Sequence, residues 1–184
     1  MSRIICISGA CGCGKTTFAD AFARHIVRQD HKTVYLIHGD DFHRGFVQPE
    51  DKGSFFVNGQ ASDRVLWEDI LRFNWDCITA VADKALWQGL DVLIDYVIED
   101  ELPRVRELAA VHWADLYCIV LTADAEEIEK RLRVRGDTDL IERALFLKGK
   151  LENMPENRGH ILNNTGRAAE ETVRDIVLDR YKVI

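Results

Sequence analysis

The segment Gly9–Thr16 constrains this chain more than any other. It reads GACGCGKT, which fits the pattern GxxxxGK[ST], and it lies between an apolar run, Arg3–Ser8, and a helical stretch that starts at Lys15. Glycines at this spacing let successive backbone N–H groups curl around a phosphate, and the helix N-terminus favours negative charge. The Lys15 amine can then reach the β- and γ-phosphates, and the Thr16 hydroxyl can bind Mg²⁺. We therefore predict a nucleotide-phosphate site.

Apolar runs alternate with segments of helical periodicity along the rest of the chain. The expected strands are Arg3–Ser8, Thr33–Ile37, Asp91–Val97, Leu116–Leu121 and His160–Asn163. The expected helices cover residues 15–28, 67–86 as one or two helices, 103–110, 124–133, 138–151 and 168–178. The polar segment 38–62 is typical of a loop. Strands separated by helices predict an α/β fold with a five-stranded parallel sheet flanked by helices.

Composition narrows the class of protein. A length of 184 residues suits a single domain, 1–184, and 47% apolar residues are enough for its core. The net charge of −7 argues against nucleic-acid and membrane partners. No signal peptide or membrane span is evident, so we expect a cytoplasmic protein. We also expect a monomer or homodimer whose partner is a small-molecule substrate.

The five cysteines are odd in number and do not suggest a disulfide framework. Cys11 and Cys13 lie inside the phosphate loop but have no second ligand pair at zinc spacing. Loop N–H groups and Lys15 favour negative charge nearby, so we expect a lowered pKa for at least one of these two thiols.

Two further features fit phosphoryl transfer. The apolar run 92–94 ends at Asp95, which would help to hold Mg²⁺, although many buried strands end in an aspartate. Arg131 and Arg135 are four residues apart at the end of a charged helix, so both can lie on one face and stabilise charge on a transferring phosphate. The alternative is an ordinary solvated helix whose arginines pair with neighbouring glutamates.

Four segments in this order resemble the gluconate kinase and shikimate kinase group of small-molecule kinases. They are Gly9–Thr16, His38–His43, Asp63–Trp67 and Glu129–Arg135. The closing segment Asn163–Gly166 and the helix after it resemble the loop on the adenine side of the nucleotide in this group. The resemblance implies a three-layer P-loop NTPase fold with an acceptor-binding segment at about 38–88 and a short helical lid at about 131–152.

Three features depart from the group. His38 stands where shikimate kinases have the first aspartate of D-x-D, and Leu66 replaces the proline of the D-R-x-P-W of gluconate kinases. The segment 96–106 lacks the serine-, lysine- and arginine-bearing segment expected of a gluconate kinase.

The resemblance also assigns roles to residues. ATP and Mg²⁺ would be the cofactors, with Thr16 and Asp95 at the metal. The nucleotide-binding residues would be Gly9, Ala10, Cys11, Gly12, Cys13, Gly14, Lys15, Thr16, Thr17, Arg131, Thr165 and Gly166. Asp40 would act on the acceptor hydroxyl as base or orienting group, Arg64 would bind a substrate carboxylate, and His43 would line the acceptor pocket. Lys15, Asp40, Arg131 and Arg135 would be the catalytic residues.

These observations predict an enzyme that transfers the γ-phosphate of Mg²⁺·ATP to a hydroxyl of a small anionic metabolite, such as a sugar acid. One alternative is a nucleoside or antibiotic kinase, for which the aromatic residues Phe42, Phe46, Phe55 and Phe56 could supply stacking. Another alternative is a nucleotide-dependent switch or binding module that has no acceptor.

Overall fold

The computed structural model describes residues 2–46, 60–62 and 65–183, and a parallel five-stranded sheet forms its centre. In spatial order the strands are β2 (Val34–His38), β5 (Asp91–Asp95), β1 (Arg3–Ser8), β6 (Asp115–Thr122) and β7 (Ile161–Asn163). All four strand pairs are parallel. The predicted α/β class and the five-stranded parallel sheet are therefore confirmed.

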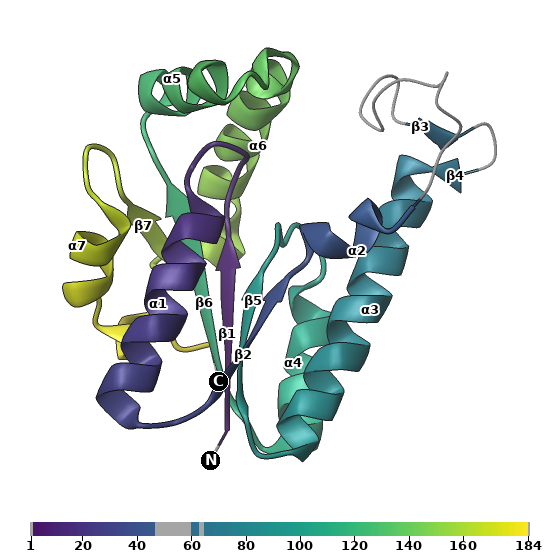
Figure 1. Ribbon diagram of the computed structural model, residues 1–184, viewed down its shortest axis with the longest axis vertical. Coiled ribbons are helices and arrows are strands. Elements are labelled where there is room, and N and C mark those ends of the chain that lie inside the picture. The colour runs from purple at the N-terminus through teal and green to yellow at the C-terminus, as the bar shows by residue number, and fades with distance from the viewer. Residues whose placement is uncertain (1, 47–59, 63–64, 184) are drawn as a thin grey trace.

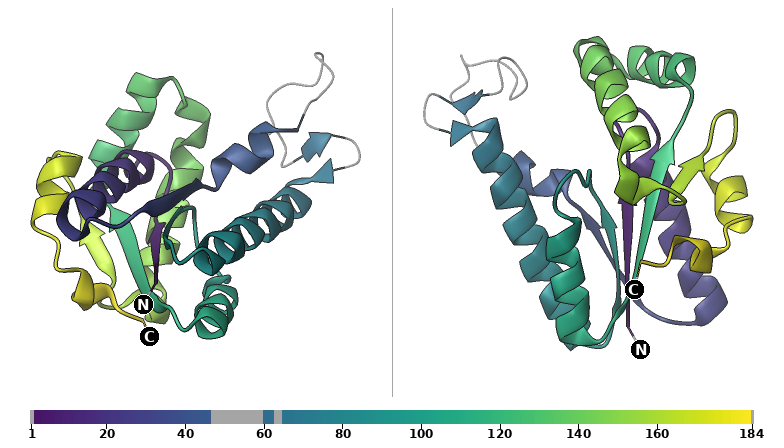
Figure 2. Two further views of the ribbon diagram at one scale, coloured as in Figure 1. Left: turned by 60° about the horizontal axis from the view of Figure 1, so that its bottom comes forward. Right: turned by 180° about the vertical axis from the view of Figure 1, so that it is seen from behind.

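The sheet has helices on both of its faces, as Figures 1 and 2 show, and it separates two apolar cores. Ile4 and Cys6 of β1 face α3 (Trp67–Trp87) and α4 (Leu102–His112). Ile5 and Ile7 face α1 (Lys15–Asp30) and α7 (Ala169–Arg174) on the other side. Because successive side chains of a strand point to opposite faces, one short apolar run supplies both cores.

A helical pair stands over the carboxyl end of β1 (Figure 1). It consists of α5 (Ala125–Arg135) and α6 (Ile141–Asn153), joined by the short 3₁₀ helix η1 (Thr138–Leu140). Asp124 is the N-cap residue of α5 and has an extended backbone, two residues after the end of β6. Pro103, the first residue of the helix expected at 103–110, lies in the first turn of α4.

The structure corrects several predicted boundaries. Of the one or two helices expected at 67–86, the structure shows one, α3, which is continuous over 21 residues because 67–87 contains no glycine or proline and Ile70, Ile78 and Ala82 keep one stripe buried. Strand β5 ends at Asp95, where its pairing with β1 also stops. The closing helix α7 ends at Arg174, and a separate 3₁₀ helix, η3, follows at Leu178–Tyr181.

The segment that was expected to be a loop contains regular structure. Helix α2 (Asp40–Arg44) starts two residues after β2, with Asp40 and Asp41 in its first turn, where carboxylates favour the helix dipole. The short strands β3 (Gln60–Ser62) and β4 (Val65–Leu66) form an antiparallel pair just before α3. In the part of the chain that is described, no helix combines the length and apolar character needed to cross a membrane.

Candidate active site

The phosphate loop follows β1 with the backbone geometry its sequence requires. Gly9 has φ +146°, and a Cβ atom there would lie 2.3 Å from the carbonyl oxygen of Leu121, so only glycine fits. The N–H of Cys13 donates to the Ala10 carbonyl at 3.3 Å, and the Lys15 ammonium donates to the same oxygen at 3.2 Å. The loop is therefore folded around its own lysine.

Lys15 lies in a negative environment. Burial alone lowers the pKa of its ammonium, but the nearby thiols and the carboxylates of Asp95 and Asp40 outweigh this, and the pKa is raised above its ordinary value. The ammonium thus stays charged at neutral pH, as a group that neutralises phosphate must.

A hydroxyl and a carboxylate converge beside the phosphate loop. The Thr16 hydroxyl, in the first turn of α1, donates to Asp95 Oδ2 at 2.8 Å, and His38 Nδ1 lies 2.9 Å from the same oxygen. Oxygen donors of this kind suit Mg²⁺, which usually takes one or two protein ligands and completes its shell with phosphate oxygens and water. The two predicted metal-binding residues, Thr16 and Asp95, therefore fit the ion. They come together from the start of α1 and the end of β5.

A cavity of about 520 Å³ opens directly from the phosphate loop. Its walls come from the loop, α2, α3, the segment after β5, and the segment from the end of α5 through η1 to α6. Five predicted site residues line it: Cys11, Thr16, Asp40, His43 and Arg135. Residues separated by more than a hundred positions thus share one cavity, which is continuous with the nucleotide-phosphate site.

Asp40 is placed by a close contact between β2 and β5. The preceding Gly39 donates its N–H to the Asp95 carbonyl at 2.9 Å, and a Cβ at Gly39 would lie 2.4 Å from the Tyr96 ring. Glycine therefore lets the chain pass over Tyr96 and begin α2 at the cavity. The Asp40 carboxylate faces solvent and the cavity from the first residue of that helix.

A buried amide joins three walls of the cavity. Asn74 of α3 is fully buried, and its Nδ2 lies 2.8 Å from Tyr96 Oη and 3.1 Å from His43 Nδ1. Burial lowers the pKa of His43 and raises the pKa of Tyr96 to about 12. Both side chains are therefore neutral at pH 7.

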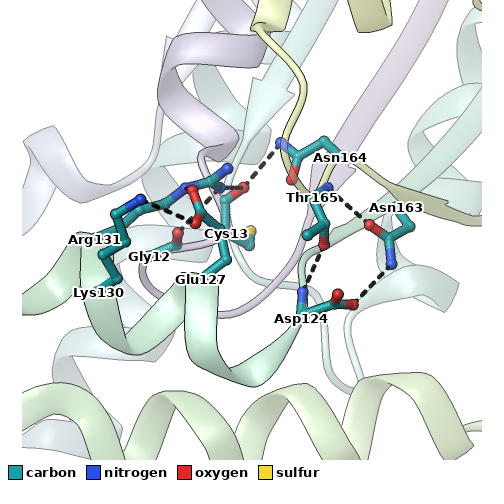
Figure 3. A network of polar contacts seen from close by, with 9 residues as sticks. All are labelled: Gly12, Cys13, Asp124, Glu127, Lys130, Arg131, Asn163, Asn164 and Thr165. Atoms are coloured by element: carbon teal, nitrogen blue, oxygen red, sulfur yellow. Dashed lines mark hydrogen bonds and ion pairs between the residues drawn. The ribbon is translucent and has the colours of Figure 1, made fainter.

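The two lid arginines make different contacts. Arg131 donates through Nη1 to the carbonyls of Cys13 at 3.0 Å and Gly12 at 3.5 Å, and through Nε to Glu127 at 2.9 Å (Figure 3). Arg135 pairs with Asp137, and both of these residues line the cavity. Arg131 therefore ties α5 to the phosphate loop, whereas Arg135 lines the cavity.

The loop after β7 reaches the phosphate loop from the other side. Asn164 is buried and donates to the Cys13 carbonyl at 3.1 Å, the oxygen that Arg131 also uses (Figure 3). The Thr165 hydroxyl accepts the N–H of Asp124 at 2.7 Å, and Gly166 follows with φ +66°. The predicted nucleotide residues Thr165 and Gly166 thus stand next to the start of the lid.

Some of the predictions take another form in the structure. Cys13 is buried, and burial raises the pKa of its thiol despite the opposing charge of Lys15, so the expectation of a lowered pKa is wrong for this residue. Arg64, predicted to bind a carboxylate, lies outside the described residues. Asn74, Trp75, Tyr96 and Arg143 were not predicted, although all but Asn74 line the cavity.

The fold and the phosphate loop together define the class of protein: it has the three-layer α/β fold of a P-loop NTPase, with a sheet between two layers of helices. A family model described as an AAA domain matches residues 5–157, and the chain belongs to that family. A search of curated proteins finds no match.

Solved structures with this fold include several kinases. The APS kinase of Mycobacterium tuberculosis, solved with AMPPNP and APS, superposes with a TM-score of 0.62 at 16% identity, covering 97% of this chain and 96% of the other. A gluconokinase of Sinorhizobium meliloti 1021 gives 0.58 at 15% identity over 98% and 91% of the two chains. A sugar kinase of a Janibacter species gives 0.55 at 16% identity over 95% and 91%. At these identities the likeness shows the fold.

Proposed function

We propose that this protein is a small-molecule kinase that transfers the γ-phosphate of Mg²⁺·ATP to a hydroxyl group. The observation that carries the proposal is that one cavity is lined by residues of both kinds. Cys11 and Thr16 come from the phosphate loop, and Asp40 and His43 are the residues predicted to bind the acceptor. A nucleotide-dependent switch needs no such second chamber. The kinases among the solved structures with this fold support the same reading.

The residues divide the work between charge and position. Lys15 supplies the cation for the transferring phosphoryl group, and Arg135 lies where a second cation could act. Bound Mg²⁺, held by Thr16 and Asp95, would neutralise charge on the β- and γ-phosphates. Asp40 would orient the acceptor hydroxyl and accept its proton, because its carboxylate borders the same cavity.

The acceptor is proposed to be a small anionic metabolite, with sugar acids as the first compounds to test. Arg44, Arg135 and Arg143 line the cavity, and Arg64 is proposed to add a carboxylate-binding group. A nucleoside or antibiotic acceptor is the second candidate. It is favoured by Trp75 and Tyr96, which both line the cavity with ring centroids 5.6 Å apart in an edge-to-face arrangement.

The test is ADP release from ATP across a panel of sugar acids, polyols, nucleosides and aminoglycosides. A kinase releases ADP at a rate that depends on one class of added compound. A rate that no acceptor changes would instead indicate the switch or binding module. Acceleration by nucleosides alone would favour the second candidate.

A further inference from the structure

The amide of Asn74 is a buried polar group next to the cavity that the proposed chemistry leaves unused. It lies in the apolar stripe of α3, where Ile70 and Ile78 occupy the adjacent turns, and it is 0% exposed. A buried amide at such a position is costly unless its hydrogen bonds serve a purpose. Its partners, His43 and Tyr96, both line the cavity.

The direction of the two hydrogen bonds follows from chemistry. An amide nitrogen has two hydrogens and only donates, so His43 Nδ1 and Tyr96 Oη must both accept. The Asn74 carbonyl oxygen is then left without a hydrogen-bond partner among the described residues, as is that of Asn164. The reversed amide would leave two N–H groups unsatisfied, which is less well tolerated than one carbonyl.

These directions determine what the two side chains present to the cavity. With its Nδ1 lone pair used, neutral His43 carries its hydrogen on Nε2, at the ring edge away from the buried amide. The Tyr96 oxygen accepts from Asn74, so its own hydrogen remains to be donated elsewhere. The carboxylate of Asp40, which lines the same cavity, can only accept.

We propose that Asn74 is a positioning residue that sets His43 and Tyr96 as neutral hydrogen-bond donors beside the acceptor-binding carboxylate of Asp40. The site would then take a substrate with two neighbouring oxygens: a hydroxyl that donates to Asp40 and receives the phosphate, and a second oxygen that accepts from His43 or Tyr96. Vicinal diols and α-hydroxy acids have this arrangement. The substrate class rests on the proposed function, whereas the donor assignment does not.

The donor assignment is tested by long-range ¹H–¹⁵N NMR of the histidine rings in the full chain at pH 7, with His43 assigned from the signals lost in His43→Gln. We expect His43 to be protonated at Nε2 and unprotonated at Nδ1. In Asn74→Asp the carboxylate accepts, so Nδ1 becomes protonated. The matched control Asn153→Asp, on the exposed side of α6, leaves the signals unchanged. A wild-type ring protonated at Nδ1, or a ring unaffected by Asn74→Asp, would overturn the proposal.

The substrate class is tested with matched pairs of small acids and alcohols in the presence of a non-hydrolysable ATP analogue. Glycerate and 3-hydroxypropionate form one such pair, since they differ only in the oxygen next to the terminal hydroxyl. We expect the compound with the neighbouring oxygen to bind about tenfold more tightly in at least one pair, the effect of one added hydrogen bond. Asn74→Leu removes this preference without changing affinity for the analogue, and Ile78→Leu, one turn further along α3, retains it.

Equal affinities within every pair, or no binding of any compound, would overturn the substrate class. The two proposals fail in different ways. If the NMR result is as expected but no acceptor supports ADP release, the proposed function fails and the donor assignment stands. If ADP release depends on an acceptor but the His43 tautomer is the opposite one, only the inference on Asn74 fails.

Discussion

The two halves of the cavity are built by different means. The phosphate side is a contiguous stretch, Gly9–Thr16, whose groups are mostly backbone N–H and whose shape follows from glycine conformations. The acceptor side is assembled by packing, from Asp40 of α2, Asn74 of α3, Tyr96 after β5 and Arg143 of the lid. A local motif fixes the first half, whereas tertiary contacts determine the second.

This difference predicts how substitutions behave. Changes on the phosphate side should remove activity with every acceptor, because the transferring group is common to all of them. Changes on the acceptor side should alter which compound is used, and how tightly, while the nucleotide remains bound.

The largest effect is expected for Lys15→Ala. Turnover should fall by about 10²–10³-fold or more, because a cation on the transferring phosphate is lost. The fold should be unchanged, since Lys15 contacts only the loop carbonyl of Ala10 among the hydrogen bonds described. Steady-state ADP release and circular dichroism check both points, with Lys84→Ala on the exposed side of α3 as the matched control. Near-normal turnover would refute the phosphate-site assignment.

Arg64→Ala should damage the acceptor side alone. A lost charge-assisted hydrogen bond costs about 1.5–3 kcal/mol, or about 10- to 150-fold in kcat/KM for an acidic acceptor. The KM for ATP should stay constant, and Arg64→Lys should also be impaired because lysine lacks the planar fork. Arg72→Ala, an exposed arginine paired with Asp69, serves as the control. Equal damage to ATP and acceptor kinetics would show that Arg64 does not bind the acid.

Asp95→Asn tests the metal residues. The Mg²⁺ concentration needed for half-maximal ATP binding should rise by about 10–100-fold, because a carboxylate next to Thr16 is lost. Titration calorimetry with ATP at several Mg²⁺ concentrations measures this without any acceptor. Asp100→Asn, exposed beyond the end of β5, should leave the requirement unchanged. An unaltered Mg²⁺ requirement in Asp95→Asn would exclude this carboxylate from the metal site.

Substitutions at two glycines distinguish the cost of a steric clash from the cost of backbone strain alone. Gly9 and Gly89 both have positive φ, but an added Cβ would meet the Leu121 carbonyl at Gly9 and nothing within 4 Å at Gly89. Gly89→Ala should therefore cost about 1 kcal/mol of unfolding free energy, and Gly9→Ala about 3 kcal/mol or more. Urea unfolding measures both, and equal losses would show that the close approach at Gly9 is unimportant.

The smallest expected effect is a pH dependence at His43. Burial lowers the pKa of His43 from the ordinary 6.5. As the pH falls, His43 therefore binds a proton at a higher pH in the unfolded chain than in the folded one. The contribution of His43 to stability is therefore complete well above pH 6.5 and is lost as the pH falls below it. Unfolding free energies between pH 8 and pH 5 should fall less steeply in His43→Gln than in the wild type. Parallel curves would contradict the lowered pKa.

The phosphate half could be predicted from the sequence because its determinants are adjacent. Gly9, Lys15 and Thr16 occupy the positions that the motif assigns, and Asp95 ends a recognisable apolar strand. The parallel sheet followed from the same alternation of apolar runs. Helix α2 was missed because its five residues are too few to show periodicity, and it packs against α3, which lies more than twenty residues further along the chain.

The acceptor half was only partly predictable. Asp40 and His43 came from a resemblance, but Tyr96 and Arg143 reach the cavity through packing that no spacing indicates. Asn74 did carry a signal: it is an amide in a stripe of buried apolar residues on α3. A lowered pKa was expected for at least one of the two loop thiols, and Cys13 does not have it, because its burial against distant elements outweighs the charge of Lys15.

The most direct test of the account follows the phosphate itself. Wild-type protein is incubated with Mg²⁺ and ATP labelled with ³²P at the γ position, together with the acceptor panel, and the products are separated and identified by mass spectrometry. The account predicts label in a phosphorylated small molecule, with transfer reduced by orders of magnitude in Lys15→Ala. Label that appears only as inorganic phosphate, at a rate no acceptor changes, would contradict the assignment of this protein as a kinase.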